Sequence, residues 1–238
     1  MDLTVVGCSP AWQNPGGAQS GYLVESDGRR LLLDCGPGVL PRLRIEEDWP
    51  RVDAIAITHF HLDHWGDLVP WAFGVLYGPG QDVPRPELWL PPDGLANLRE
   101  LGRPFGARAV LEVFAAREYR EGEPFRAAGF ELTPVQMAHY DETTYGFRVN
   151  GDGRTLAYSG DSAPGPHLRT LARDADLFVC EATLADPEPA ERGHLTADEA
   201  VGAFRESGAR RLLVVHRPDE LPLPDGVERA RDGYTTAV

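Results

Sequence analysis

The sequence predicts an α/β protein in which helices cover β-sheets. Short runs of β-branched or apolar residues, bounded by Gly, Pro, Asp or Asn, recur along the 238 residues and are typical of strands. Segments with helical periodicity lie between them, an alternation that is typical of α/β folds. Several strand-like runs are too apolar to have one face in water, which indicates sheets that are covered on both faces.

Ten runs are predicted as strands, and they are divided equally between the two halves of the chain. In the first half the runs are 3–7, 21–25, 31–34, 54–58 and 87–90. In the second half they are 130–137, 145–149, 155–159, 177–180 and 212–215. A core that is rich in β-sheet is therefore expected.

Three segments have a helical pattern, namely 93–101, 166–173 and 196–207. The third is the clearest, because Thr196 and Glu199 are spaced as in a capping box and Gly208 is a stop signal. The Pro- and Gly-rich segment 78–92 is predicted to be a loop, and its composition does not resemble a long interdomain linker. With 42% hydrophobic residues the chain can bury a full core, so one domain spanning 1–238 is expected.

Composition and charge restrict the partners and the compartment. The net charge of −14 disfavours unaided binding to a polyanion. Three cysteines, Cys8, Cys35 and Cys180, are few and far apart, which predicts small buried residues in a reducing compartment rather than disulfides. The first residues do not resemble a signal peptide, and no run of about 18 apolar residues occurs. The cytoplasm is therefore the expected location, without a membrane partner.

The strongest chemical signal is the run His59-Phe60-His61-Leu62-Asp63-His64, which directly follows a predicted strand. Imidazole and carboxylate groups together suit zinc and similar divalent ions. On a turn after the strand, His59 and His61 can face one metal while Asp63 and His64 face a second. The alternative is a solvated polar loop, which is disfavoured because the chain has only seven histidines.

Three further candidate ligands also follow predicted strands: His139, Asp161 and His216. Strand ends on one side of a sheet converge, so these residues can complete one site with the first motif. Taken alone, each would more often be an ordinary surface or buried polar residue. Together with the motif at 59–64, however, a role as metal ligands is favoured for all three residues.

These residues resemble the signature of the metallo-β-lactamase-fold hydrolase superfamily. The resemblance implies a four-layer αβ/βα sandwich of two mixed β-sheets flanked by helices, with two metals at one edge. It implies one metal held by His59, His61 and His139, a second held by Asp63, His64 and His216, and Asp161 as the carboxylate that bridges them. The segments 158–161 and 33–36 also resemble the family, and Asp34 is expected behind the ligands.

Two segments, 180–183 and 193–196, are similar to paired motifs of the ribonuclease Z-like branch. The resemblance implies that Glu181 orients His194, which protonates the leaving oxygen, so that Asp63, Glu181 and His194 are the catalytic residues. Without the resemblance, Glu181 is a strand-end charge and His194 a residue before a helix cap. The chain departs from that branch at Cys180, where His is usual, and at Leu195, where Ser is usual.

The interval between His139 and Asp161 is also too short for the long arm with which transfer-RNA-processing members grip their substrate. The sequence therefore predicts a phosphodiesterase that cleaves cyclic or short phosphodiesters with two divalent ions. Zinc is the first expectation, and manganese or iron are alternatives. Transfer-RNA 3′-processing, lactone or thioester hydrolysis, and a metal-binding interaction module remain alternative functions. The resemblance also implies a homodimer.

Four aromatic residues, Trp65, Trp71, Phe73 and Tyr77, follow the metal motif at loosely helical spacing. Such a pattern usually indicates core packing, so all four are expected in the core. The alternative is an aromatic rim that stacks a nucleobase beside the metals. The seventh histidine, His167, is expected at the surface outside the site.

Overall fold

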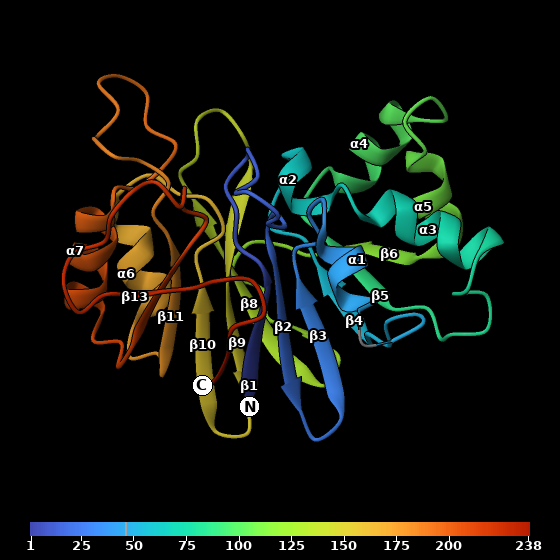
Figure 1. The fold of residues 1–238 in the computed structure, drawn as a ribbon, viewed down its shortest axis with the longest axis horizontal. Coiled ribbons are helices and arrows are strands. Elements are labelled where there is room, and N and C mark those ends of the chain that lie inside the picture. The colour runs from blue at the N-terminus through green and yellow to red at the C-terminus, as the bar shows by residue number, and fades with distance from the viewer. Residues whose placement is uncertain (46) are drawn as a thin grey trace.

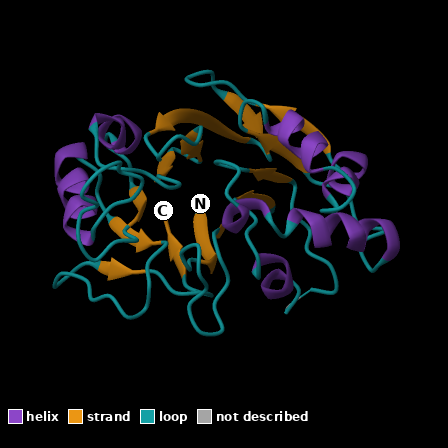
Figure 2. Cartoon of the chain, turned by 90° about the horizontal axis from the view of Figure 1, so that it is seen from above, coloured by secondary structure: helices purple, strands orange, loops and turns teal. Residues whose placement is uncertain are grey.

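In the computed structural model, which describes residues 1–45 and 47–238, two seven-stranded sheets pack face to face (Figure 1). Helices lie on the outer face of each sheet, so that the molecule has four layers when it is seen from above (Figure 2). The α/β class and the four-layer sandwich of two mixed sheets are confirmed.

The first sheet has the strand order β14-β1-β2-β3-β4-β5-β6. Neighbouring strands are antiparallel from β14 to β3 and parallel from β3 to β6. Their bounds are β1 Asp2–Gly7, β2 Gly21–Ser26, β3 Arg29–Leu33, β4 Ala54–Ala56, β5 Glu87–Leu90, β6 Ala115–Glu118 and β14 Thr235–Ala237.

The second sheet has the order β13-β12-β11-β10-β9-β8-β7. It is antiparallel from β7 to β10 and parallel from β10 to β13. Its strands are β7 Phe125–Ala127, β8 Phe130–Met137, β9 Thr144–Gly151, β10 Arg154–Tyr158, β11 Leu177–Glu181, β12 Leu212–Val215 and β13 Glu228–Arg229.

The helices are divided between the two outer layers (Figures 1 and 2). Those beside the first sheet are α1 Val39–Leu43, α2 Leu62–Trp65, α3 Leu68–Tyr77, α4 Gly94–Leu101 and α5 Ala107–Val113. Those beside the second are α6 Pro166–Ala172 and α7 Ala197–Ser207. None of the helices that the structure describes is long and apolar enough to cross a membrane.

The core follows from this layering. One apolar cluster fills the space between the sheets and includes Leu3, Tyr22, Leu31, Phe147 and Leu213. A second cluster lies between the first sheet and its helices, and a third lies between the second sheet and its helices. Central strands are therefore covered on both faces, and every residue of β11 and β12 is buried. Cys8, Cys35 and Cys180 are buried free thiols, as predicted.

All ten predicted strands and all three predicted helices are present. The capping box of α7 forms, because Thr196 Oγ1 accepts from the Glu199 amide at 3.3 Å and Glu199 Oε2 accepts from the Thr196 amide at 2.9 Å. The predicted loop 78–92 overlaps the predicted strand 87–90, and the structure has strand β5 at Glu87–Leu90. The loop prediction is therefore wrong for these four residues. The core prediction is right for Trp65 and Trp71 but wrong for Phe73 and Tyr77, which are 43% and 77% exposed.

An ion cluster at the lower edge of the second sheet joins β10 to β11. The Asp176 carboxylate accepts from the Thr155 amide, from Arg154 and from Arg210, each at 2.9 Å. The Thr155 hydrogen bond, followed by the two guanidinium groups, lowers the pKa of Asp176 below its ordinary value.

We expect Asp176→Asn to destabilise the fold at pH 7 by about 1–2 kcal/mol, because charge-assisted hydrogen bonds are lost. A lowered folded-state pKa gives stabilisation that is present above the unfolded pKa of about 4 and is lost as pH falls through the folded value. Urea unfolding of both proteins at several pH values measures this, and the difference should shrink in acid. Glu112→Gln, which removes an exposed i,i+4 partner of Arg108, is the control and should change stability by less than about 0.5 kcal/mol. A pH-independent difference would contradict the assignment.

Candidate metal centre

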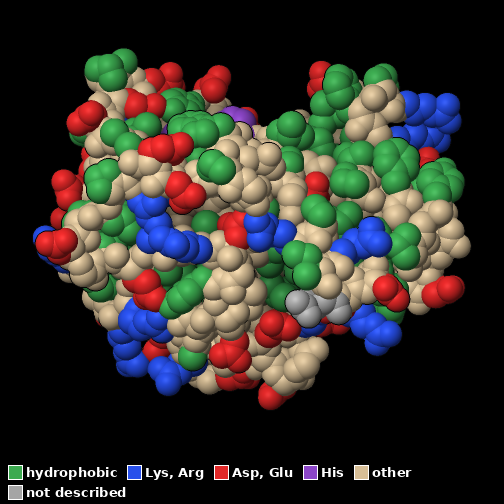
Figure 3. Space-filling model, viewed as in Figure 1, with side chains coloured by type: hydrophobic (Ala, Val, Ile, Leu, Met, Phe, Trp, Pro, Cys, Tyr) green, Lys and Arg blue, Asp and Glu red, His purple; other side chains and the backbone are tan. Residues whose placement is uncertain are grey.

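The predicted ligands lie on loops at one edge of the two sheets, the upper edge in Figure 1. His59 and His61 follow β4, and Asp63 and His64 lie in α2. The other three follow β8, β10 and β12 at the same edge: His139, Asp161 and His216. Figure 3 shows a histidine at the bottom of a hollow between two shoulders along this edge.

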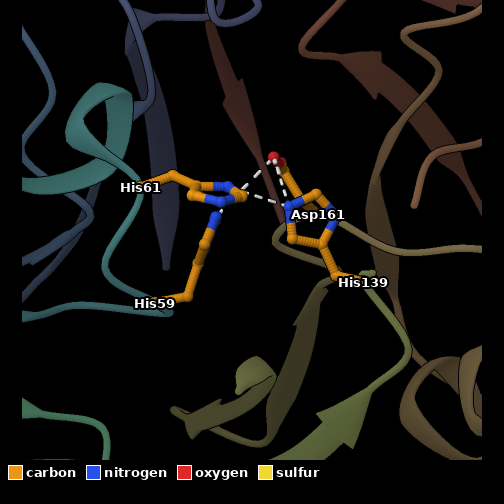
Figure 4. Close-up of side chains that lie close together, drawn as sticks. All are labelled: His59, His61, His139 and Asp161. Atoms are coloured by element: carbon orange, nitrogen blue, oxygen red, sulfur yellow. Dashed lines mark hydrogen bonds and ion pairs between the residues drawn. The ribbon is translucent and has the colours of Figure 1, made fainter. Parts of the chain in front are cut away.

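One group consists of His59, His61, His139 and Asp161, whose ligand atoms all lie within 4.8 Å of one another (Figure 4). Asp161 Oδ2 is 3.8 Å from Nε2 of both His59 and His139. His61 Nδ1 is 2.9 Å from His139 Nε2. Three imidazoles and one carboxylate oxygen therefore converge on a single point.

A second group consists of Asp63, His64, Asp161 and His216, again within 4.8 Å. His216 Nε2 is 3.1 Å from Asp63 Oδ2, and His64 Nε2 is 3.3 Å from Asp161 Oδ1. Asp161 thus presents Oδ2 to the first group and Oδ1 to the second. The structure brings all seven predicted ligands together and divides them as the resemblance implies.

Four of the histidines use Nδ1 for a hydrogen bond with the surrounding protein. The partners are Thr58 Oγ1 for His59 at 3.0 Å, Asp34 Oδ2 for His64 at 2.8 Å, the Gly193 carbonyl for His139 at 2.7 Å, and Thr183 Oγ1 for His216 at 2.9 Å. These hydrogen bonds fix the orientation of each ring and direct its Nε2 atom toward the centre of the ligand group. Metal-binding histidines are usually held in this way.

Three of the ligand atoms that face inward have no hydrogen bond to the described part of the protein. Among the described residues, His59 Nε2, His64 Nε2 and Asp161 Oδ1 are buried without a hydrogen bond. An unpartnered buried polar atom is costly, so this concentration at one place needs an explanation. Divalent cations fit the donor set of imidazole nitrogens and carboxylate oxygens.

The electrostatics favour the same conclusion. Burial, and then the neighbouring His64, lowers the pKa of His59, which favours the neutral imidazole that a ligand needs. Burial would also lower the pKa of His64, but the carboxylates of Asp161, Asp63 and Asp34 raise it. Burial would raise the pKa values of Asp63 and Asp161, but the adjacent histidines, chiefly His64 and His216, lower both. The carboxylates are therefore ionised in a buried place. Buried charges of this kind are paired or coordinate metals.

Asp34 supports this arrangement from behind. Its carboxylate is fully buried and accepts from the Thr58 amide at 2.8 Å, from His64 Nδ1 at 2.8 Å and from Tyr158 Oη at 2.7 Å. Asp34 has a φ of 59°, a left-handed conformation that is uncommon outside glycine. The turn after β3 holds the carboxylate against the strand that carries the first motif.

Glu181 and His194 lie beside the two groups. His194 Nδ1 is 2.9 Å from Glu181 Oε1, and this carboxylate also accepts from the Ser162 and Thr183 amides at 2.9 and 3.0 Å. Glu181 is fully buried, whereas His194 is half-buried. Burial would lower the pKa of His194, but Glu181, Asp161 and Glu188 raise it to about 9.

A cavity of about 630 Å³ opens over the cluster and is lined by His61, Asp63, Asp161, His194 and Tyr140. Tyr140 was not predicted as a site residue, although an aromatic residue directly after His139 was a signal for it. Thr58, Thr183 and Gly193 lie in segments that the sequence singles out, but their hydrogen bonds to the histidines were not predicted, since short polar residues and glycine carry no distinctive pattern. His167 is half-buried, bonds Ser162 Oγ at 2.9 Å and stands outside both groups.

A family model described as "Beta-lactamase superfamily domain" matches residues 29–217. The uncharacterized protein ML1173 of Mycobacterium leprae is 33% identical over 99% of this chain and 85% of its own length. YhfI of Bacillus subtilis, named a probable metallo-hydrolase, is 30% identical over 92% of this chain and 87% of its own. A ribonuclease Z of Salinibacter ruber is 30% identical over 100% of this chain and 91% of its own.

Solved structures show the same fold. The crystal structure of Bacillus subtilis YhfI, a metallo-β-lactamase-fold protein, superposes with a TM-score of 0.85 at 24% identity and covers 99% of both chains. A diphosphatase from the PhnP family has a TM-score of 0.78 at 22% identity, with 100% of this chain and 97% of that chain covered. With this fold, the matched family model and the dinuclear His/Asp motif, the chain belongs to the metallo-β-lactamase superfamily and is a metal-dependent hydrolase.

Proposed function

We propose that this protein is a phosphodiesterase that cleaves cyclic or short phosphodiesters with two divalent metal ions. The observation that carries the proposal is the hydrogen-bonded pair Glu181–His194 beside the metal groups. Hydrolysis of a phosphodiester expels an alkoxide or aryloxide, and a positioned imidazole supplies the proton that this leaving group needs. The names of two similar proteins, ribonuclease Z and diphosphatase, also denote cleavage of phosphorus–oxygen bonds.

In this proposal His59, His61 and His139 would hold one ion, Asp63, His64 and His216 would hold the other, and Asp161 would offer a carboxylate oxygen to each. Zinc is the first expectation for both ions. When bound, such ions make a water-derived nucleophile available near neutral pH and neutralise charge on the attacked group. The identity of the metal rests on the donor set alone, which manganese or iron also suits.

The chain's own residues perform the remaining steps. Asp63 lines the cavity, where its carboxylate accepts a hydrogen bond from the attacking water. His194 donates its proton to the leaving oxygen, and the buried Glu181 carboxylate keeps the imidazole in one orientation and tautomer. Water attacks phosphorus and releases one proton to solvent, the bond from phosphorus to the leaving oxygen breaks, and the proton from His194 completes the alcohol. His194 then regains a proton from solvent.

Transfer-RNA processing is the weaker alternative. The stretch between His139 and Asp161 consists of β9, β10 and their turns, which leaves no room for an RNA-gripping arm. The net charge of −14 also opposes binding of a large polyanion. Hydrolysis of a thioester uses the same metals but expels a thiolate, which does not need a proton from the Glu181–His194 pair. Hydrolysis of a lactone expels an alkoxide that the pair could protonate, so a lactone has to be assayed beside the diester.

Removal of the metals tests the proposal most directly. We expect turnover of bis(p-nitrophenyl) phosphate that a chelator abolishes and added zinc restores, because the nucleophile depends on the ions. The monoester p-nitrophenyl phosphate and a simple lactone are assayed on the same sample, together with metal content, and should react much more slowly. If metal-replete protein hydrolysed only the lactone, the phosphodiesterase proposal would be wrong and the enzyme would be a carbonyl hydrolase.

We expect His194→Ala to lower kcat for a phosphodiester with an alkoxide leaving group by about 10²- to 10³-fold, because general-acid catalysis is lost. The loss should be much smaller for bis(p-nitrophenyl) phosphate, whose leaving group departs without a proton. Metal content should stay at the wild-type value, since His194 is outside both proposed ligand sets. The matched control is His167→Ala, which removes a histidine that neither lines the cavity nor belongs to a possible metal-binding group among the described residues, and it should leave kcat unchanged. Full activity of the His194 variant would refute its role.

We expect Asp34→Asn to weaken metal binding by about 10- to 100-fold, because His64 and Thr58 lose an ionised acceptor that fixes their positions. Competition with a chromophoric chelator measures the affinity. Asp53→Asn is the matched control, since Asp53 accepts from the Arg30 amide at 2.8 Å at the other end of β3 and is exposed. Equal affinities in the two variants would show that Asp34 has no part in holding the ligands.

A further inference from the structure

Tyr140 combines a strained backbone with an exposed aromatic ring beside the metal centre. It directly follows His139, has a φ of 47° and is 39% exposed. A bulky residue in the left-handed region is a genuine outlier, and such strain persists where the surroundings over-determine the conformation, often at functional sites. With this backbone conformation, the ring lines the cavity and is not packed in the core.

The inner face of the ring is held by the loop that carries His194. The ring centroid lies 5.0 Å from that of His139 and 5.7 Å from that of His194. At Gly193 a Cβ atom would lie 2.1 Å from the ring, so any side chain there would displace it. Glycine is therefore required at 193 for the loop to pass this close to the ring.

Glu188 locks the two segments together. Its Oε1 accepts from Tyr140 Oη at 2.5 Å, and its Oε2 accepts from the Gly193 amide at 2.8 Å. One carboxylate therefore joins the ring to the peptide that precedes His194. The ring cannot rotate away without breaking this charge-assisted hydrogen bond.

The rest of the cavity wall indicates what the ring contacts. The rest of the wall consists of three apolar residues and two uncharged glutamines: Ala11, Pro37, Leu62, Gln13 and Gln19. Among the described residues, neither lysine nor arginine lines the cavity. A polyphosphate or a second phosphate would find no cationic side chain here apart from histidine. An uncharged planar group fits the flat ring and apolar neighbours better.

We propose that the Tyr140 ring is a stacking platform that selects phosphodiesters with an uncharged aromatic ester group, and that Glu188 fixes the platform. The inference rests on the proposed phosphodiesterase function, because it assigns the group attached to the reacting phosphate. Tyr140 is a specificity-determining residue in this assignment, whereas the proton donor remains His194.

The test compares binding of phenyl phosphate and methyl phosphate to zinc-loaded protein by calorimetry, with KM and kcat for bis(p-nitrophenyl) phosphate measured alongside. We expect wild type to bind phenyl phosphate about tenfold more tightly than methyl phosphate. Tyr140→Leu should remove this preference and raise KM about tenfold with kcat within about twofold. Tyr140→Phe, which keeps the ring, should retain most of the preference.

Tyr77→Leu makes the same change at an exposed tyrosine of α3 outside the cavity and should behave as wild type. Equal binding of the two probes by wild type, or a Tyr140→Leu variant that loses kcat but keeps the phenyl preference, would overturn the assignment. Calorimetry measures binding and needs no turnover. If the protein showed no diesterase activity but still preferred phenyl phosphate in a way that depends on Tyr140, the proposed reaction would be refuted and the stacking platform would stand.

Discussion

Burial of the Asp161 carboxylate among imidazoles is the constraint on which the rest of the centre depends. The side chain is only 2% exposed, and its two oxygens face different groups of histidines. A charge in such a place must be compensated, since transfer of an ionised carboxylate out of water costs many kcal/mol. The ends of β4, β8, β10 and β12 are held around it by two sheets that pack face to face.

The positions of the ligands depend in turn on a shell of hydrogen bonds. Thr58, Asp34, Thr183 and the Gly193 carbonyl each engage the Nδ1 atom of one histidine, so that Nε2 points inward. Asp34, His216 and Tyr140 all have positive φ and all border the centre. This strain is tolerated because the packed sheets beneath determine where the loops begin and end.

The strands that the sequence did not predict are β6, β7, β13 and β14, and they are the four edge strands of the two sheets. An edge strand has one neighbour and a partly solvated surface, so it carries less of the apolar signal that identifies a central strand. Most residues of β6 and β14 are exposed and both residues of β13 are half-buried, whereas β5, β8 and β12 were predicted with their observed bounds. Helix α3 was missed because Pro70 and Gly74 interrupt an otherwise apolar segment.

The sequence by itself determined the α/β class, the central strands and the candidate ligands, because apolar periodicity and the compact run from His59 to His64 are local patterns. The tertiary structure was needed to show which Asp161 oxygen faces which group, at what distance Glu181 and His194 meet, and that Tyr140 rather than Phe73 or Tyr77 lines the cavity. These contacts join residues that are far apart in the chain or lie on loops. Their geometry depends on where the strands end in space and on the strained turns between them, which no local pattern encodes.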